Sequence, residues 1–171
     1  MESKTVSEEM LYKQWINHKE LGQLKTINGE DVEVLDIGVF NGDEGGPDFK
    51  NSRIRIGNFV FIGDVEIDTN YSDWINHAHN LNNHYNKVIL HVSLYNKQNQ
   101  EYVYTRDGRK IPTLCLSNYL SPSMLESMIK ETDTIKTNHA YLKCLTDINL
   151  LNEEKKIEIL SKMGIERLNK K

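Results

Sequence analysis

Residues 59–68 constrain the fold most strongly, because one set of alternate positions is apolar or glycine while the other ends in three acids. Since side chains on a strand repeat every two residues, this pattern predicts a strand with an apolar face and an acidic face. Residues 49–56 also alternate, and Gly57-Asn58 between the two segments is typical of a two-residue turn. The sequence therefore predicts an antiparallel hairpin whose apolar face carries Ile54, Ile56, Phe59, Phe61, Val65 and Ile67.

The acidic face of this hairpin is a candidate metal site. Asp64, Glu66 and Asp68 repel one another on one strand face, and a basic side chain or a divalent cation would relieve that repulsion. Mg²⁺ takes oxygen ligands, commonly one or two carboxylates with water and phosphate oxygens. The alternative interpretation is an edge strand with a solvated acidic face.

Asp48, which follows Pro47, is the other candidate ligand, but the ideal hairpin places it on the wrong face. With the turn at residues 57–58, Asp48 pairs with Ile67, and cross-strand partners share a face. Asp48 joins Glu66 only if a bulge between Asp48 and Arg53 shifts the register, or if the turn differs by one residue.

The order of the remaining elements predicts an α/β (α+β) fold with a mixed β-sheet flanked by helices. We expect residues 1–120 to form this core and residues 121–171 to form a helical extension that mediates self-association through an apolar stripe on its last helix. The other expected elements are helices at residues 7–21, 72–83 and 152–170, a helix starting at 121–122, strands at 32–37 and 88–95, and a hairpin near 107–108.

Composition excludes several classes of protein. The chain has 171 residues, a net charge of −4 and a pI of about 5.9, which argue against a surface that grips nucleic acid all over. No apolar run approaches the roughly 20 residues of a membrane span. Cys115 and Cys144 are expected to be free thiols, which is typical of a reducing, cytoplasmic location.

Five motifs follow one another along the chain. They are Gly46-Pro47-Asp48-Phe49 with Asn51, Ile54 and Ile56; Gly63 with Val65-Glu66-Ile67; Ser72-Asp73-Trp74 with His77 and His79; Tyr85 with Val88-Ile89-Leu90-His91-Val92; and Asp107-Gly108 with Ile111-Pro112-Thr113-Leu114. In this order and spacing the chain resembles the bacterial domain-of-unknown-function 2851 family over about residues 8–168. The resemblance implies that it corresponds to the N-terminal part of a longer protein.

The same region is similar to the PD-(D/E)XK nuclease pattern, and the α-β-β-β-α-β order is that of restriction-endonuclease-like cores. The resemblance implies that Asp48 and Glu66 bind Mg²⁺ or Mn²⁺ and that the substrate is DNA. Beside them we expect the following groups: Asp68 as a catalytic position, Lys50, Arg53 and Arg55 as substrate-binding cations, and Glu8, His77 and His91 as groups that support the metal ligands or act as general base.

One position departs from that pattern. The nuclease pattern has lysine where this chain has Asp68, and an aspartate anion can neither orient the attacking water nor stabilise charge at the phosphate as lysine does. Two hypotheses stay open: a metal-dependent phosphodiesterase with another source of positive charge, and a catalytically degenerate module that binds nucleic acid or protein.

The histidines do not predict a zinc site. In the helix expected at residues 72–83, His77 and His79 point roughly 200° apart and cannot hold one ion. His77 shares a helix face with Trp74, and His91 lies on a buried strand, so both are interpreted as hydrogen-bonded core residues.

Overall fold

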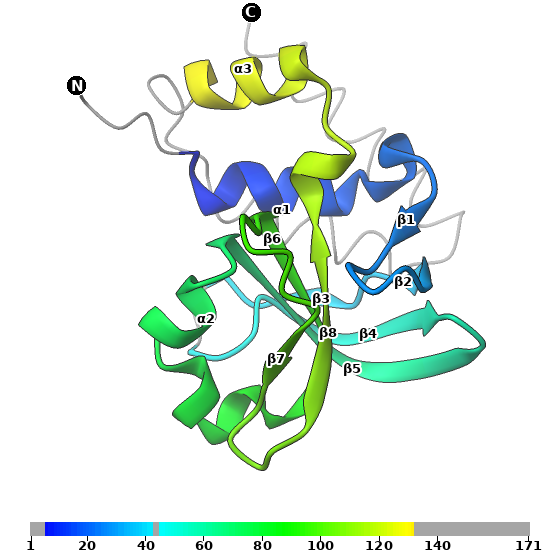
Figure 1. Ribbon diagram of the computed structural model, residues 1–171, viewed down its shortest axis with the longest axis vertical. Coiled ribbons are helices and arrows are strands. Elements are labelled where there is room, and N and C mark those ends of the chain that lie inside the picture. Colours follow the sequence, from blue (N-terminus) through cyan, green and yellow to red (C-terminus); the bar gives the residue numbers. More distant parts are fainter. Residues whose placement is uncertain (1–5, 43–44, 132–171) are drawn as a thin grey trace, which may run out of the picture.

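A mixed β-sheet forms the centre of the computed structural model, which describes residues 6–42 and 45–131 (Figure 1). The strands are β1 (Leu24–Lys25), β2 (Asp31–Asp36), β3 (Val39–Phe40), β4 (Phe49–Ile56), β5 (Phe59–Asn70), β6 (Val88–Tyr95), β7 (Tyr102–Tyr104) and β8 (Lys110–Cys115). The helices are α1 (Glu8–Ile16), α2 (Asp73–Asn76) and α3 (Pro122–Glu131), with 3-10 turns η1 (His18–Leu21), η2 (His79–Leu81), η3 (Asn83–Lys87) and η4 (Leu116–Asn118).

The strand order is β1-β2-β4-β5-β6-β8-β7, and β3 pairs with β4. Pairing is antiparallel from β1 to β5, parallel between β5, β6 and β8, and antiparallel again between β8 and β7. The expected α+β class and the four principal strands are confirmed. The hairpins expected at residues 57–58 and near 107–108 are confirmed, and β1 and β2 form another hairpin around residues 28–29.

Helix α1 covers the apolar face of the sheet. Its side chains Leu11 and Trp15 are fully buried in one cluster with Val65 and Ile67 of β5 and with apolar residues of β6. A separate, smaller cluster around Trp74 joins α2 and η3 to β7 and β8. The Trp74 ring contacts the His91 ring, so this cluster lies on the face that carries the acids.

The prediction of one continuous helix at residues 72–83 is wrong. Helix α2 ends at Asn76, because Ala78 adopts a left-handed conformation with φ of 58° that no α-helix accommodates. Two 3-10 turns, η2 and η3, follow it. Leu81, expected on the buried face of that helix, is 65% exposed. The first helix is also shorter than expected and continues as the 3-10 turn η1 after Asn17.

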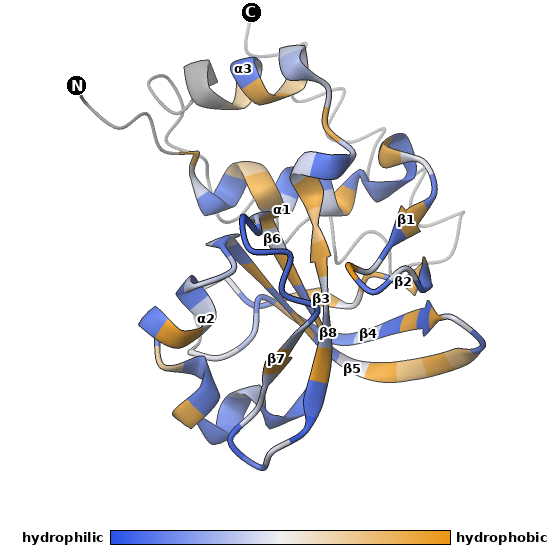
Figure 2. Ribbon diagram, in the orientation of Figure 1, coloured by the Kyte–Doolittle hydropathy of each residue, from blue (hydrophilic) through white to orange (hydrophobic). Residues whose placement is uncertain are grey.

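At the far end of the β4–β5 hairpin, the expected burial of the apolar face is wrong. Phe59 and Phe61 are exposed rather than buried, as are Val60 and Ile62 on the opposite side of the strand. Strand β6 starts beside Asp64, so no strand in the described part of the chain pairs with residues 59–62 on that edge. Figure 2 shows this projecting end of β5 as a continuous hydrophobic stretch.

The C-terminal expectations are tested only at their start. Helix α3 begins at Pro122, and the Ser121 hydroxyl accepts a hydrogen bond from the Met124 backbone N–H at 3.2 Å, as expected of an N-cap. The helix expected at residues 152–170, and with it the self-association surface, lies outside the described residues.

A bulge in β4 decides which side of the sheet Asp48 occupies. Phe49 pairs with Val65, yet Ser52 pairs with Gly63, so β4 holds one extra residue between these pairs. Asn51, inside the bulge, has a φ of 57°, and its backbone N–H donates to Asp64 Oδ1 at 3.0 Å. The shifted register brings Asp48 level with Glu66, which is the condition that the sequence set for a shared site.

Substituting Asn51 tests the bulge. The Asn51 side chain is exposed, so the expected effect of Asn51→Val comes from its backbone conformation, which β-branched residues disfavour. We expect Asn51→Val to lower the free energy of unfolding by about 1–2 kcal/mol, and Asn51→Gly to leave it nearly unchanged. Chemical denaturation measures both. Equal stability of the two variants would contradict the left-handed assignment.

Candidate functional site

Asp48 and Glu66 meet where β4 starts. The Asp48 backbone N–H donates to Glu66 Oε2 at 3.2 Å, and the Ile67 backbone N–H donates to Asp48 Oδ2 at 2.8 Å. Asp48 Oδ1 accepts a hydrogen bond of 2.7 Å from the Tyr12 hydroxyl of α1. The two carboxylates that the sequence predicted to share a site are therefore adjacent. Hydrogen bonds from α1, from β5 and from the start of β4 hold them.

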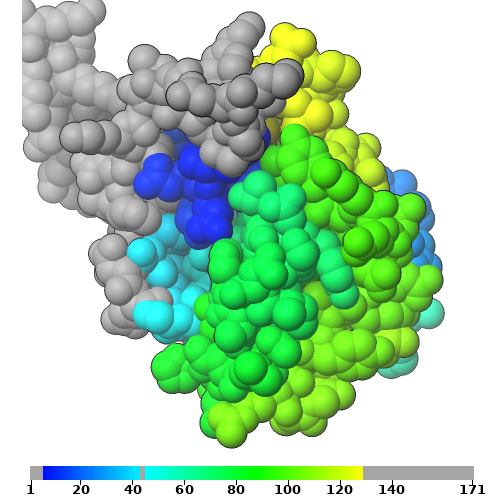
Figure 3. All heavy atoms as spheres, turned by 60° about the vertical axis from the view of Figure 1, so that its left-hand side comes forward, coloured from blue at the N-terminus to red at the C-terminus, as the bar shows by residue number. Residues whose placement is uncertain are grey.

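Helix α1 also brings Glu8 to this site. The Tyr12 hydroxyl lies 3.5 Å from Glu8 Oε2, one helical turn earlier. Partial burial raises the pKa of Glu8, the negative charge of Asp68 raises it further, and His77 opposes both effects. Figure 3 shows α1 (blue), the chain leading into β4 (cyan) and the segment around α2 (green) meeting on one face of the molecule.

Asp68, the residue that stands where the nuclease pattern has lysine, is surrounded by histidines. Its Oδ2 lies 3.0 Å from His91 Nε2 of β6. Its Oδ1 lies 3.4 Å from His77 Nδ1 and 3.8 Å from His79 Nε2. His79 Nε2 is also 3.0 Å from Glu66 Oε1, so this ring links Glu66 to Asp68.

The break at Ala78 explains how both histidines reach Asp68. In a continuous helix they would diverge, but the left-handed residue between them turns both rings to one side, with centroids 5.3 Å apart. Sequence reasoning excluded this pairing, and that exclusion is wrong. His79 stacks on Tyr85 at 4.0 Å, and Trp74 contacts the edges of His79 and His91.

The environment drives the pKa values of the acids in opposite directions. Burial, then the charge of Glu66, raises the pKa of Asp48 well above its usual range. Burial, then the charge of Asp68, does the same for Glu66. Burial alone would raise the pKa of Asp68 as well, but His79 and His91 lower it to about 2. Asp68 is thus an anion while the Asp48–Glu66 pair favours a proton or another positive charge.

The two arginines expected as substrate-binding cations on β4 lie away from these acids. Arg53 pairs across the hairpin with Ile62, and Arg55 forms an exposed ion pair with Glu33 of β2. Lys50 lines a cleft of about 540 Å³ together with Asp64, His84 and Lys87. In the described part of the chain, histidines supply the ion pairs of Glu66 and Asp68.

Three residues of the site escaped sequence reasoning: Tyr12, His79 and Tyr85. Tyr12 was assigned to the apolar stripe of the first helix, and its hydroxyl gave no signal of a partner far along the chain. The closely spaced His77 and His79 were a signal, but the assumption of a helix concealed it.

A family model described as a protein of unknown function, DUF2851, matches residues 8–171 and so includes every element of this site. The chain belongs to the DUF2851 family. No curated protein and no solved structure is similar to it. What this DUF2851 protein does therefore has to be inferred from the site itself.

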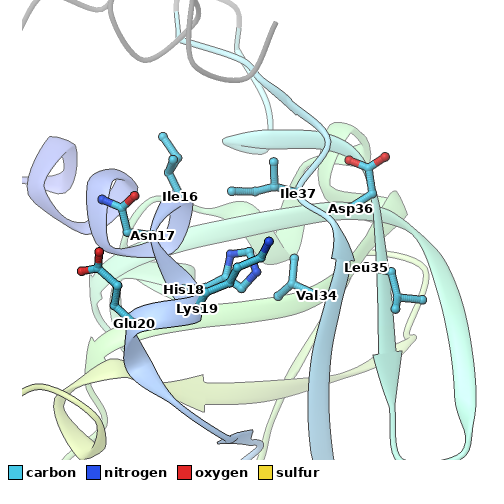
Figure 4. A pocket seen from close by; sticks show the side chains of 9 residues that line it. All are labelled: Ile16, Asn17, His18, Lys19, Glu20, Val34, Leu35, Asp36 and Ile37. Atoms are coloured by element: carbon cyan, nitrogen blue, oxygen red, sulfur yellow. The ribbon is translucent and has the colours of Figure 1, made fainter. Parts of the chain in front are cut away.

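A second hollow lies on the other side of β4, between the end of α1 and β2 (Figure 4). It measures about 510 Å³ and is lined by residues 16–20 and 34–37. None of the acids or histidines described above lines it.

Among the described residues, no helix is long and apolar enough to span a membrane.

The raised pKa values predict a falling stability with pH. Each of Asp48 and Glu66 keeps its proton to higher pH in the folded chain than in the unfolded chain, so each stabilises the fold at low pH and loses that contribution as pH rises. In chelator, we expect Glu66→Gln to raise Tm by a few degrees at pH 8 and to change it little near pH 4. Glu33→Gln, on the exposed surface, is the matched control.

Asp68 acts in a different pH window. Because its pKa is lowered in the folded chain, Asp68 stabilises the fold above pH 4, and this contribution is lost as pH falls toward 2. The pH dependence is therefore opposite in direction to that of Asp48 and Glu66.

Melting curves of the wild type and Glu66→Gln that differ equally at all pH values would contradict the assignment of raised pKa values to the Asp48–Glu66 pair.

Proposed function

We propose that this protein is a metal-dependent phosphodiesterase with a restriction-endonuclease-like core that acts on DNA. The observation that carries the proposal is the convergence of Asp48 and Glu66 from adjacent strands, produced by the β4 bulge. Burial and mutual repulsion favour the binding of a proton or a cation to these two adjoining carboxylates. Paired carboxylates are the usual protein ligands of a magnesium ion that acts on phosphate esters.

The arrangement of strands supports the proposal. Helix α1 precedes three antiparallel strands, β2, β4 and β5, and the segment containing α2 then leads to β6, parallel to β5. This is the α-β-β-β-α-β order that the sequence suggested. Asp48 immediately precedes the second of these strands and Glu66 lies on the third, which is consistent with the two acidic residues of the nuclease pattern.

The residues present fit a divalent cation. Asp48 and Glu66 would hold it, because each carboxylate oxygen keeps a lone pair beyond the hydrogen bond it already accepts. A bound Mg²⁺ or Mn²⁺ supplies a polarised phosphoryl oxygen and a water of lowered pKa. Tyr12 and the Ile67 N–H fix the Asp48 carboxylate, so that it does not rotate away from Glu66.

A cleft beside the site offers a place for the DNA backbone. It begins at Pro47, next to Asp48, and includes Lys50, His84 and Lys87. Lys50 and Lys87 outnumber the acid Asp64 in its lining, which gives the cleft local positive charge on a chain whose net charge is −4. Phosphates bound there would lie next to the carboxylate pair, which is consistent with a local rather than a general grip on nucleic acid.

The proposal predicts hydrolysis that depends on both acids. With Mn²⁺ or Mg²⁺, the wild type is expected to cleave bis(4-nitrophenyl) phosphate and labelled DNA. Asp48→Asn and Glu66→Gln should each reduce the rate more than about 100-fold, beyond what the loss of a supporting residue causes. Glu33→Gln removes an acid of equal charge from β2 and should retain the wild-type rate within about twofold.

The second candidate is a module that binds DNA without cutting it. It is favoured by one observation: both oxygens of Asp48 already accept hydrogen bonds, from Tyr12 and from Ile67. In that case the wild type would show no hydrolysis above the level of Asp48→Asn with any metal, but would still shift labelled DNA in a gel. No hydrolysis and no shift would overturn both candidates.

A further inference from the structure

We propose that Asp68, His77 and His79 bind a divalent transition metal ion of the zinc class, at a site distinct from the Asp48–Glu66 pair. The three side chains come from β5 and from the two sides of the break at Ala78. The inference goes beyond the proposed hydrolysis and does not need it, because it concerns binding alone.

The spacing of the ligand atoms fits one ion. Asp68 Oδ1, His77 Nδ1 and a ring nitrogen of His79 all lie within 4.8 Å of one another. The Asp68–His77 distance is 3.4 Å and the Asp68–His79 distance is 3.8 Å. Ligands around zinc, at its usual bond lengths, are roughly 3.0–3.4 Å apart, so closing the site needs the His79 ring to move toward Asp68 and His77.

A buried nitrogen without a hydrogen bond points independently to a ligand. The His79 side chain is 9% exposed, and its Nε2 has no hydrogen-bond partner among the described residues. Glu66 Oε1 lies 3.0 Å away, but outside hydrogen-bonding geometry. A buried polar atom left in this way costs free energy, which an ion bound at Nε2 would recover.

Neighbouring groups hold the ligands in place. His91 engages Asp68 Oδ2 and leaves Oδ1 directed at the other two histidines. Tyr85 stacks on His79 and fixes the plane of its ring. Support of this kind behind the ligands is what tunes metal affinity in proteins.

The ligand set selects the class of metal. Imidazole nitrogens suit zinc and its neighbours, whereas Mg²⁺ prefers oxygen ligands. His77 is 48% exposed, which leaves the ion an entry path and an open position for water. A cation here would also place positive charge at the residue where the nuclease pattern has lysine, next to Glu66.

Cobalt is the most informative probe, because bound Co²⁺ absorbs visible light. We expect one equivalent of Co²⁺ to bind the full chain, Zn²⁺ to displace it, and excess Mg²⁺ to leave it in place. His77→Gln and His79→Gln should each weaken binding at least about tenfold. His18→Gln, a histidine of η1 that lines the hollow beside β2, is the matched control and should bind as the wild type does.

The outcomes separate this site from the proposed hydrolysis. His77→Gln changes a half-exposed side chain, so a normal melting curve with lost Co²⁺ binding supports the site rather than a folding defect. Absence of Co²⁺ and Zn²⁺ binding to the wild type, or equal weakening by His18→Gln, would overturn it. Co²⁺ binding without any phosphodiesterase activity would support this site and count against the proposed function alone.

Discussion

The candidate site depends on a single extra residue in β4. In a regular hairpin Asp48 would face the apolar side, where α1 packs, and a carboxylate there would have to be buried among Val65 and Ile67. The bulge at Asn51 reverses the face of the sheet to which the preceding side chains of β4 point, so that Asp48 joins Glu66. The backbone of one residue, stabilised by the Asp64 side chain, thus determines the electrostatics of the whole face.

Once three acids share that face, charge balance determines what surrounds them. His79 and His91 lower the pKa of Asp68 to about 2, so it stays ionised. Burial and the charge of a neighbouring carboxylate raise the pKa values of Asp48 and Glu66, which therefore tend to hold a proton. Neighbouring acids with pKa values driven apart are a common feature of sites that move protons or bind cations.

Much of this architecture could be predicted from the sequence, because it follows from side-chain periodicity. The alternation in residues 49–68 predicted both strands and the turn. The register of an ideal hairpin further predicted that Asp48 joins Glu66 only with a bulge between Asp48 and Arg53 or with a turn that differs by one residue. Ala78 gave no such signal: alanine favours helices, and its left-handed backbone follows from packing of Trp74 and His79 that only the folded chain contains. The pairing of His77 with His79 could not be anticipated for the same reason.

The projecting end of the β4–β5 hairpin has a consequence for how the protein behaves at high concentration. Within the described residues, the edge of residues 59–62 pairs with no strand and has apolar side chains on both faces, which makes it a template for adding strands from other molecules, and so for aggregation. Arg55 lies across from Val60 and Arg53 across from Ile62. Their charges lie beside these two exposed apolar side chains and disfavour the stacking of one hairpin on another.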